Sequence, residues 1–134
     1  LGVKGIPVSI INSNPTAELL LPQGHNGPSF LAYSNYDIFL KWNDSFIYTV
    51  TAAYLAKRLE GKKPFSHMNP EGILDQNDMI ILQEKLVKLG EDVGKLDGIL
   101  GAKTRQAVRK WQLKTGFIAD SWPTRNFFQV LKSY

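Results

Sequence analysis

The stretch 97–112, which reads DGILGAKTRQAVRKWQ, decides the fold of the C-terminal half of this chain. Gly98 and Gly101 permit a tight turn, and the residues after the turn have the period of an amphipathic helix. The helix should begin near Lys103 and end at Gly116, because glycine is favoured just past a helix C-terminus. Its buried face is predicted to consist of Ala107, Val108 and Trp111.

Two further helices are predicted, one on either side of this one. In the first, Asp75 is the expected N-cap, Asp78 the acidic partner of a capping box, and Gly90 the glycine after the last turn. Pro123 and Thr124 open the other helix. Apolar residues recur at spacings of three and four in both, so three short helices should surround one small core. These residues are Met79, Leu82, Leu86 and Leu89 in the first helix, and Phe127, Phe128 and Leu131 in the other.

The N-terminal part has a different pattern. Turn-forming residues at 23–28 separate short runs of β-branched and aromatic residues, which predicts a small antiparallel sheet. From Ser45 the period becomes helical, with Ser45 as N-cap and Gly61 at the end of one long helix. One face of this helix is expected to carry Ile47, Val50, Tyr54, Leu55 and Leu59. The predicted strand segments are 8–11, 19–21, 30–33 and 36–40.

A segment rich in Gly, Pro and polar residues divides the chain. We therefore predict an N-terminal unit 1–61, a linker 62–73 and a C-terminal unit 74–134, with an α+β fold overall. About sixty residues bury little surface by themselves, so the N-terminal unit should require a partner segment upstream. The absence of an initial Met fits the expectation of a fragment or a processed product.

The composition excludes several classes of protein. The chain has 134 residues and no cysteine, which rules out a disulfide framework and thiolate metal ligands. No apolar run approaches the ~20 residues that span a bilayer, and no secretory signal is visible. The formal net charge is +4, yet the basic residues are interspersed with acidic ones, as on a solvated helix surface. Neither a nucleic-acid partner nor a transmembrane segment is expected.

The C-terminal half resembles a known domain in several separated positions. Leu82-Gln83, the turn 97–101, the helix residues 103–108 and Trp111-Gln112 stand in the order found in the three-helix peptidoglycan-binding domain of many cell-wall hydrolases. The resemblance covers about residues 74–133 and implies binding to the bacterial cell wall. It also implies a ligand groove near the turn, with these candidate contacts: Asp97, Gly98, Arg105 and Gln112.

Some of these residues also have purely structural explanations. Arg105 could pair with a carboxylate of a stem peptide, whereas Asp97 or Thr104 could simply satisfy the backbone amides at the helix start. At 120–122, Asp-Ser-Trp replaces the Asp-Gly-aromatic turn that is usual in the family. A serine at the glycine position should strain this turn.

The N-terminal half carries a second, independent resemblance. LPQGHNGPSFL at 21–31 and WNDSFIY at 42–48 are similar to the end of the lysozyme-like catalytic domain of the lytic murein transglycosylase B family. In that family a Pro-x-Gly-x-x-Gly-Pro-x-Phe-Leu stretch precedes an aromatic-Asn-x-Ser-x-x-Tyr motif on the floor of the saccharide cleft. The residues implied as saccharide contacts are Trp42, Asn43, Ser45 and Tyr48.

The chemistry of this motif suits a sugar, because aromatic rings supply stacking surface while amide and hydroxyl groups supply directional hydrogen bonds. Trp42 stands where Tyr is common in the family. By residue type alone, Trp42 and Tyr48 would fit a core position, and Ser45 would serve as an N-cap.

The resemblance implies one catalytic Glu. It would protonate the glycosidic oxygen and then accept the proton of the C6 hydroxyl that attacks C1. In the family this Glu lies upstream, in a Glu-Ser-x-x-Gly context that none of the present Glu residues has, so we assign no catalytic acid here. A conventional glycosidase would need two carboxylates, and Asp37 and Asp44 are better explained as a strand residue and a helix-start charge. The Glu residues are Glu18, Glu60, Glu71, Glu84 and Glu91.

Neither a metal nor a cofactor is indicated. His25 and His67 stand alone in predicted loops, without a second ligand at metal-binding spacing, so we expect solvated histidines. The glycines of 98–104 follow no strand and lack the spacing of a phosphate-binding loop.

Together the two resemblances imply the C-terminal part of a lytic murein transglycosylase. Such an enzyme cleaves the MurNAc-β-1,4-GlcNAc bond without water and leaves 1,6-anhydromuramyl products, and the present chain should be inactive alone. The expected partners are glycan strands, stem peptides and an upstream segment of the same protein. The expected location is the periplasm of a Gram-negative cell, with attachment to the outer membrane. The alternative is a non-catalytic peptidoglycan-binding protein, since an amidase or peptidase would need metal ligands or a nucleophile that we do not find.

Overall fold

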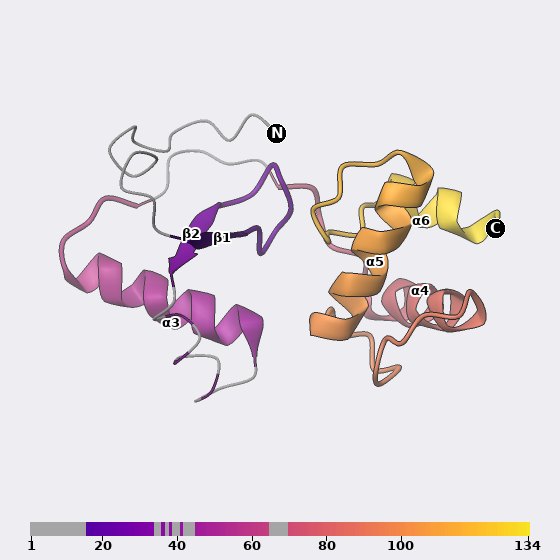
Figure 1. The fold of residues 1–134 in the computed structure, drawn as a ribbon, viewed down its shortest axis with the longest axis horizontal. Coiled ribbons are helices and arrows are strands. Elements are labelled where there is room, and N and C mark those ends of the chain that lie inside the picture. The colour runs from indigo at the N-terminus through magenta and orange to yellow at the C-terminus, as the bar shows by residue number, and fades with distance from the viewer. Residues whose placement is uncertain (1–15, 34–35, 37, 39–40, 42–44, 65–69) are drawn as a thin grey trace.

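The computed structural model describes residues 16–33, 36, 38, 41, 45–64 and 70–134. In these residues a two-stranded sheet and one helix precede three further helices, so the fold is α+β as expected (Figure 1). None of the helices in these ranges has the length and the apolar character needed to cross a membrane. The elements are β1 Ala17–Leu20, β2 Phe30–Tyr33, α3 Phe46–Leu59, α4 Gln76–Lys88, α5 Ala102–Thr115 and α6 Arg125–Lys132.

The sheet confirms two of the predicted strands. β1 and β2 pair antiparallel, with Ala17 opposite Tyr33 and Leu20 opposite Phe30. These strands match the predicted segments 19–21 and 30–33 within the one or two residues by which element ends commonly differ. The predicted segment 8–11 lies outside the described residues.

The predicted strand at 36–40 is wrong at its two described residues, Tyr36 and Ile38, because both are helical. Tyr36, Phe39 and Leu40 have spacings of three and four in the sequence, which suit a helix as well as a strand. A short apolar run cannot be assigned by its period alone. Tyr36 is buried and packs with Ala32 and Val50 in the small N-terminal core.

Helix α3 begins where the sequence predicts. Ser45 is its N-cap, and the Ser45 hydroxyl accepts a hydrogen bond from the Tyr48 N–H. Of the predicted apolar face, Val50 is buried, but Leu55 is 58% exposed and Leu59 is 81% exposed. Ile47 is also exposed, so most of this face is uncovered within the chain.

The three C-terminal helices form the core that their apolar spacing predicts. Asp75 caps α4 by accepting from the Asp78 N–H at 2.9 Å, although the Asp78 carboxylate pairs with Arg125 instead of completing a capping box. Gly90 has φ +86° and ends α4 with the paired backbone hydrogen bonds of a Schellman motif. Thr124 caps α6. The fully buried apolar side chains of these described residues are Met79, Leu82, Leu86, Val108, Pro123, Phe127, Phe128 and Leu131.

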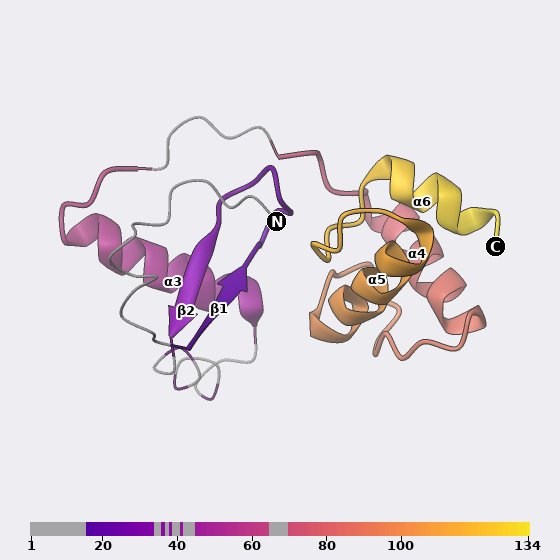
Figure 2. The same ribbon diagram turned by 45° about the horizontal axis from the view of Figure 1, so that its top comes forward.

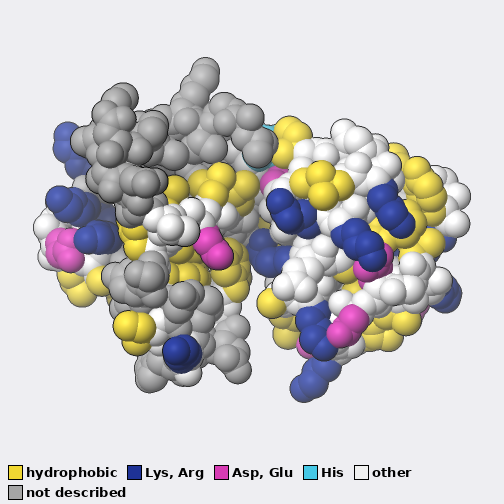
Figure 3. All heavy atoms as spheres, in the orientation of Figure 1, with side chains coloured by type: hydrophobic (Ala, Val, Ile, Leu, Met, Phe, Trp, Pro, Cys, Tyr) yellow, Lys and Arg dark blue, Asp and Glu magenta, His cyan; other side chains and the backbone are white. Residues whose placement is uncertain are grey.

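The two halves of the molecule lie side by side. The loop between β1 and β2 reaches the loop between α5 and α6, and both views of the ribbon show this approach (Figures 1 and 2). Below their contact an open furrow separates the halves on the face seen in Figure 3. The first turns of α3 and α5 border this side of the junction (Figures 1 and 2). Lys and Arg side chains are spread over both halves of this face instead of forming one basic patch.

Candidate functional site

The first turn of α3 holds two of the predicted saccharide contacts, Ser45 and Tyr48. The Ser45 hydroxyl accepts from the Tyr48 N–H at 3.3 Å, and the Ser45 carbonyl accepts from the Thr49 hydroxyl at 3.0 Å. Ser45 therefore has the capping role that its residue type suggests. The Tyr48 side chain is half exposed, so a ligand can reach it. Trp42 and Asn43, the other two predicted contacts, lie outside the described residues.

The turn 97–101 holds Asp97 and Gly98, which were predicted as peptidoglycan contacts. Asp97 Oδ1 accepts from the Ile99 N–H at 2.9 Å, so this carboxylate stabilises its own turn. Gly98 has φ +75°, and a Cβ at this position would lie 2.5 Å from Gln76 Cγ. Glycine is therefore required both by the backbone conformation and by the close approach of α4.

Buried Gln83 connects this turn to α5. Its Oε1 accepts from the Gly98 N–H at 3.0 Å, and its Nε2 donates to the Ile99 carbonyl and the Thr104 hydroxyl. Thr104 donates in turn to the Val93 carbonyl. The expectation that Asp97 or Thr104 caps α5 is wrong, because the N-cap is Gly101 and no side chain bonds there. Both side chains hold the preceding loop instead.

A surface hollow of about 240 Å³ opens beside this turn and the start of α5. It combines the exposed apolar side chain of Ile99 with basic and acidic groups and with backbone at the start of a helix. Such a mixture can take an amphipathic ligand that carries both sugar-like and charged groups. The lining residues are Val93, Lys95, Asp97, Ile99, Gly101, Ala102, Lys103 and Thr104.

Arg105, one turn into α5, lies at the junction of the halves and is buried. Its Nη2 donates to the Pro22 carbonyl at 2.9 Å. The guanidinium carbon lies 4.9 Å from the centre of the Phe46 ring and 5.8 Å from that of Trp122. Burial lowers the pKa of Arg105 to about 10, against an opposing effect of Asp120, so the group is charged at neutral pH. Its Nε has no hydrogen-bond partner.

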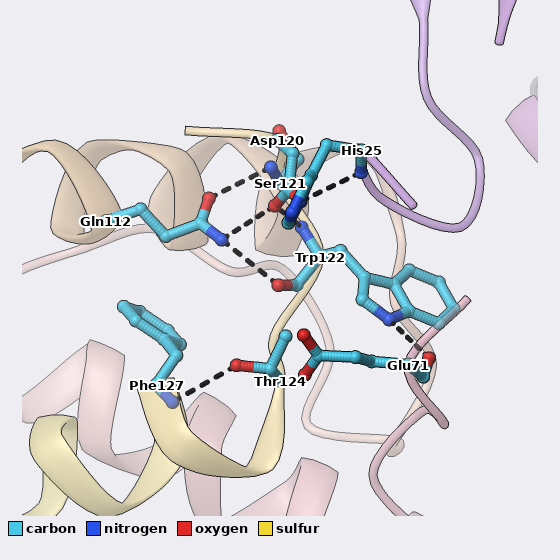
Figure 4. Close-up of polar contacts among 8 residues, drawn as sticks. All are labelled: His25, Glu71, Gln112, Asp120, Ser121, Trp122, Thr124 and Phe127. Carbon is cyan, nitrogen blue, oxygen red and sulfur yellow. Dashed lines mark hydrogen bonds and ion pairs between the residues drawn. The ribbon is translucent and has the colours of Figure 1, made fainter. Parts of the chain in front are cut away.

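Gln112 lies behind the turn 120–122 and is also buried. Its Nε2 donates to Asp120 Oδ1 at 2.8 Å and to the Trp122 carbonyl at 3.0 Å (Figure 4). Its Oε1 accepts from the Ser121 N–H at 2.9 Å, so the whole amide is used in shaping the turn. Ser121 has φ +63°, which confirms the strain expected for a serine at this position. Contact of Arg105 and Gln112 with peptidoglycan stays a prediction.

Asp120 contacts a residue of the other half, His25. Asp120 Oδ2 accepts from the His25 N–H at 3.0 Å and lies 2.7 Å from His25 Nδ1 (Figure 4). Burial raises the pKa of the Asp120 carboxyl, but hydrogen bonds, first among them that of His25, outweigh this effect and lower the pKa below its usual value. Because an ionised carboxylate only accepts, Nδ1 must carry the proton. The prediction that His25 is isolated is therefore wrong, although the residue is exposed, as expected.

Sequence reasoning thus missed His25 and Asp120 as a pair. They are 95 positions apart, and no local pattern links residues at such a distance. The signal that could have suggested them is the position of each within a turn: Gly24 and Gly27 flank His25, and Asp120 directly precedes Ser121, where the turn departs from the family pattern.

None of the glutamates, all of which lie among the described residues, has the properties of a buried general acid. Glu18, Glu60, Glu71 and Glu84 are exposed. Glu91 is partly buried, but its hydrogen bond with Lys110 lowers the pKa, whereas a general acid requires a raised one. Within the described residues, no three His, Asp or Glu side chains gather at a spacing that could hold a metal ion.

Two family models match the chain, in the order that the sequence predicts. Residues 1–57 match the transglycosylase SLT domain family, and residues 68–131 match a peptidoglycan binding domain family. A comparison with curated proteins found no match to the chain.

Solved structures of SltB3 from Pseudomonas aeruginosa are similar to this chain at 37% sequence identity. The complex with NAG-anhNAM-pentapeptide has a TM-score of 0.73 over 98% of this chain and 36% of the SltB3 chain. The complex with NAG-NAM-pentapeptide has a TM-score of 0.66 over 97% of this chain and 35% of the SltB3 chain. The present chain thus spans about a third of the length of these relatives.

The fold and the site define a segment of a transglycosylase SLT domain that continues into a peptidoglycan binding domain. The chain belongs to the lytic murein transglycosylase B family, and its match to the transglycosylase SLT domain is followed by its match to the peptidoglycan binding domain.

Proposed function

We propose that the protein containing this chain cleaves the MurNAc-β-1,4-GlcNAc bond of peptidoglycan without water and leaves 1,6-anhydromuramyl ends. The observation that carries this proposal is the presence of both matched domains on one chain, at 37% identity to SltB3. SltB3 has been solved with NAG-anhNAM-pentapeptide, whose anhydro sugar has the form of such a product end.

The N-terminal unit 1–61 is proposed to supply part of the saccharide cleft. Tyr48 supports this role, because its half-exposed ring stands in the first turn of α3, directly beside Ser45. A phenol ring offers stacking surface and its hydroxyl a directional hydrogen bond, as sugar recognition requires. Trp42 and Asn43 belong to the same proposed set of contacts through their place in the sequence motif.

The unit 74–134 is proposed to hold the enzyme on the cell wall, after the linker 62–73. The hollow beside the turn 97–101 supports this role, because it offers apolar, charged and backbone groups together. Asp97 lines this hollow, and Gly98 follows it in the same turn. Arg105 and Gln112 complete the proposed set, and because both are buried, a ligand would reach them only if the residues around them moved.

The catalytic acid is proposed to lie in a part of the protein outside this chain. That acid would protonate the glycosidic oxygen while the C6 hydroxyl of the muramic residue attacks C1. The leaving sugar would carry away this proton, and the C6 hydroxyl proton would return to the carboxylate, so that no water is consumed. The contacts at the start of α3 would orient the muramic ring for this attack.

We further propose that the protein acts in the periplasm, because its proposed substrate is peptidoglycan, and that it is attached to the outer membrane. The glycan strands and stem peptides of peptidoglycan would be the partners, together with the remaining catalytic segment of the same protein.

The test compares the intact protein with the 134-residue chain on purified murein sacculi. The intact protein should release soluble muropeptides, whereas the chain should bind sacculi in a sedimentation assay and release nothing. Release by the chain alone would place the catalytic acid within it and overturn the assignment. Binding without release by the intact protein would favour the non-catalytic alternative.

A further inference from the structure

Two short backbone segments meet at the junction of the halves, the loop 22–27 and the turn 120–122. Asp120 joins them, because its two carboxylate oxygens serve different halves. Oδ1 accepts from Gln112 Nε2 and from the Trp122 N–H inside the binding domain. Oδ2 accepts from the His25 N–H and bonds His25 Nδ1 in the other half. A buried carboxylate is costly unless such bonds satisfy it, so both halves contribute to keeping it ionised.

The backbone is shaped for this contact on both sides. Gly24 has φ +74°, and a Cβ there would lie 2.9 Å from Asp120 Oδ2 and 2.9 Å from Trp122 Cβ. The loop can therefore approach the turn only with glycine at this position. On the other side, Ser121 holds a left-handed conformation that serine rarely adopts. Unusual backbone on both faces of one contact indicates a specific interface.

Arg105 makes a second contact a short distance away. It donates to the Pro22 carbonyl of the same loop and lies against the ring of Phe46. Phe46 is the first residue of α3, directly after Ser45 and two residues before Tyr48. The buried guanidinium of Arg105, in the binding domain, thus packs against the first turn of α3, which carries the proposed saccharide contacts Ser45 and Tyr48.

We propose that His25, Asp120 and Arg105 form a docking clasp that fixes the binding domain against the first turn of α3. In this arrangement the three are positioning residues, which act on the reaction by holding Ser45 and Tyr48 in place. The proposal rests on the proposed function for its consequence in catalysis, and on the contacts alone for its structural part.

The structural part is tested by hydrogen–deuterium exchange of the intact protein. The variant Gly24→Ala places a methyl group against Asp120 and Trp122. The matched control is Gly61→Ala, since Gly61 also has positive φ, at +79°, but no atom lies within 4 Å of its added Cβ. Gly24→Ala should speed exchange in the peptides that cover 22–27 and 118–122, and the control should not. Equal exchange in the two variants would overturn the clasp.

The positioning role is tested with His25 variants of the intact protein on soluble glycan strands. His25→Ala removes the Nδ1 donor, while His25→Asn restores an N–H near the same place. His25→Ala should lower kcat by about tenfold or more, because small displacements of positioning groups are costly. KM for strands and sedimentation with sacculi should change little, and His25→Asn should recover most of kcat.

The outcomes separate the two proposals. An unaltered kcat in His25→Ala, with an active wild-type protein, would refute the positioning role and leave the proposed function standing. An inactive wild-type protein would refute the proposed function, and the exchange experiment would still decide whether the clasp exists.

Discussion

The substitution Asp120→Asn should destabilise the protein by about 3 kcal/mol near neutral pH. The estimate follows from the four hydrogen bonds of the buried carboxylate, two on each oxygen. An asparagine presents one acceptor oxygen and one NH₂ group with two N–H donors, so one of the two carboxylate oxygens is replaced by a group that faces other donors. Hydrogen bonds to a charged group contribute roughly 1.5–3 kcal/mol each, and breaking a buried ionic arrangement costs roughly 3–5 kcal/mol.

The dependence on pH gives this prediction a second signature. Because the pKa of Asp120 is lowered in the folded state, ionisation stabilises the fold at pH values above the unfolded pKa of about 3.9. That contribution is lost as the pH falls toward the folded pKa. The stability difference between the native protein and Asp120→Asn should therefore shrink in acid.

Urea unfolding followed by tryptophan fluorescence measures both effects, near neutral pH and near pH ~3. Asp92→Asn is the matched control, since Asp92 forms an exposed pair with Lys103 at 2.7 Å and should contribute little. A destabilisation of Asp120→Asn no larger than that of the control, or one independent of pH, would refute the reasoning.

Three further substitutions test separate parts of the account. Ser121→Gly should stabilise the binding domain by about 0.5–1 kcal/mol in thermal unfolding, because glycine tolerates φ +63°, and a lower Tm would contradict this. Phe127→Ala should cost about 3–5 kcal/mol, because the ring is fully buried, so a loss below ~1 kcal/mol would show that the core is not as described. Tyr48→Phe should weaken binding of NAG-NAM-pentapeptide to the intact protein about fivefold, because the ligand would lose a hydrogen bond to the hydroxyl of this half-exposed residue. Unchanged affinity would remove Tyr48 from the proposed contacts.

The helices of the binding domain were predictable because their signals are local. Asp75 and Thr124 cap helices through their own side chains, and Gly90 and Gly116 end helices with positive φ. Each of these signals involves residues within one turn of the helix end, and a single sequence displays them directly. The strain at Ser121 was predictable in the same way, as a non-glycine residue in a turn that needs glycine.

The failed predictions have two causes, an ambiguous local pattern and contacts between residues far apart in the sequence. Tyr36 is helical but was predicted to lie in a strand, because a short apolar run does not distinguish a helix from a strand. The Thr104 hydroxyl does not cap the helix start, because it accepts a hydrogen bond from buried Gln83 and donates one to the Val93 carbonyl. His25 contacts Asp120 because the fold brings their two loops together. Neither the contacts of Thr104 nor the pair of His25 and Asp120 has a spacing that could be recognised in the sequence.

The predictions for helix α3 were correct for its ends and wrong for the burial of part of its apolar face. Its start at Ser45 follows from the capping preference, and its end at Gly61 from the conformational freedom of glycine. Its apolar spacing correctly indicated a helix, but Leu55 and Leu59 are exposed instead of buried. Periodicity identifies the face that can be buried, and only the surrounding structure decides whether another element covers it.

The chemical form of the cleaved ends tests the central claim most directly. Sacculi digested with the intact protein should yield muropeptides whose mass by mass spectrometry is one water lower than that of the hydrolysed forms, and chemical reduction should leave them unchanged. Reducible ends that carry the added water would contradict the account, because they would identify a hydrolase with a second carboxylate in place of a lytic transglycosylase.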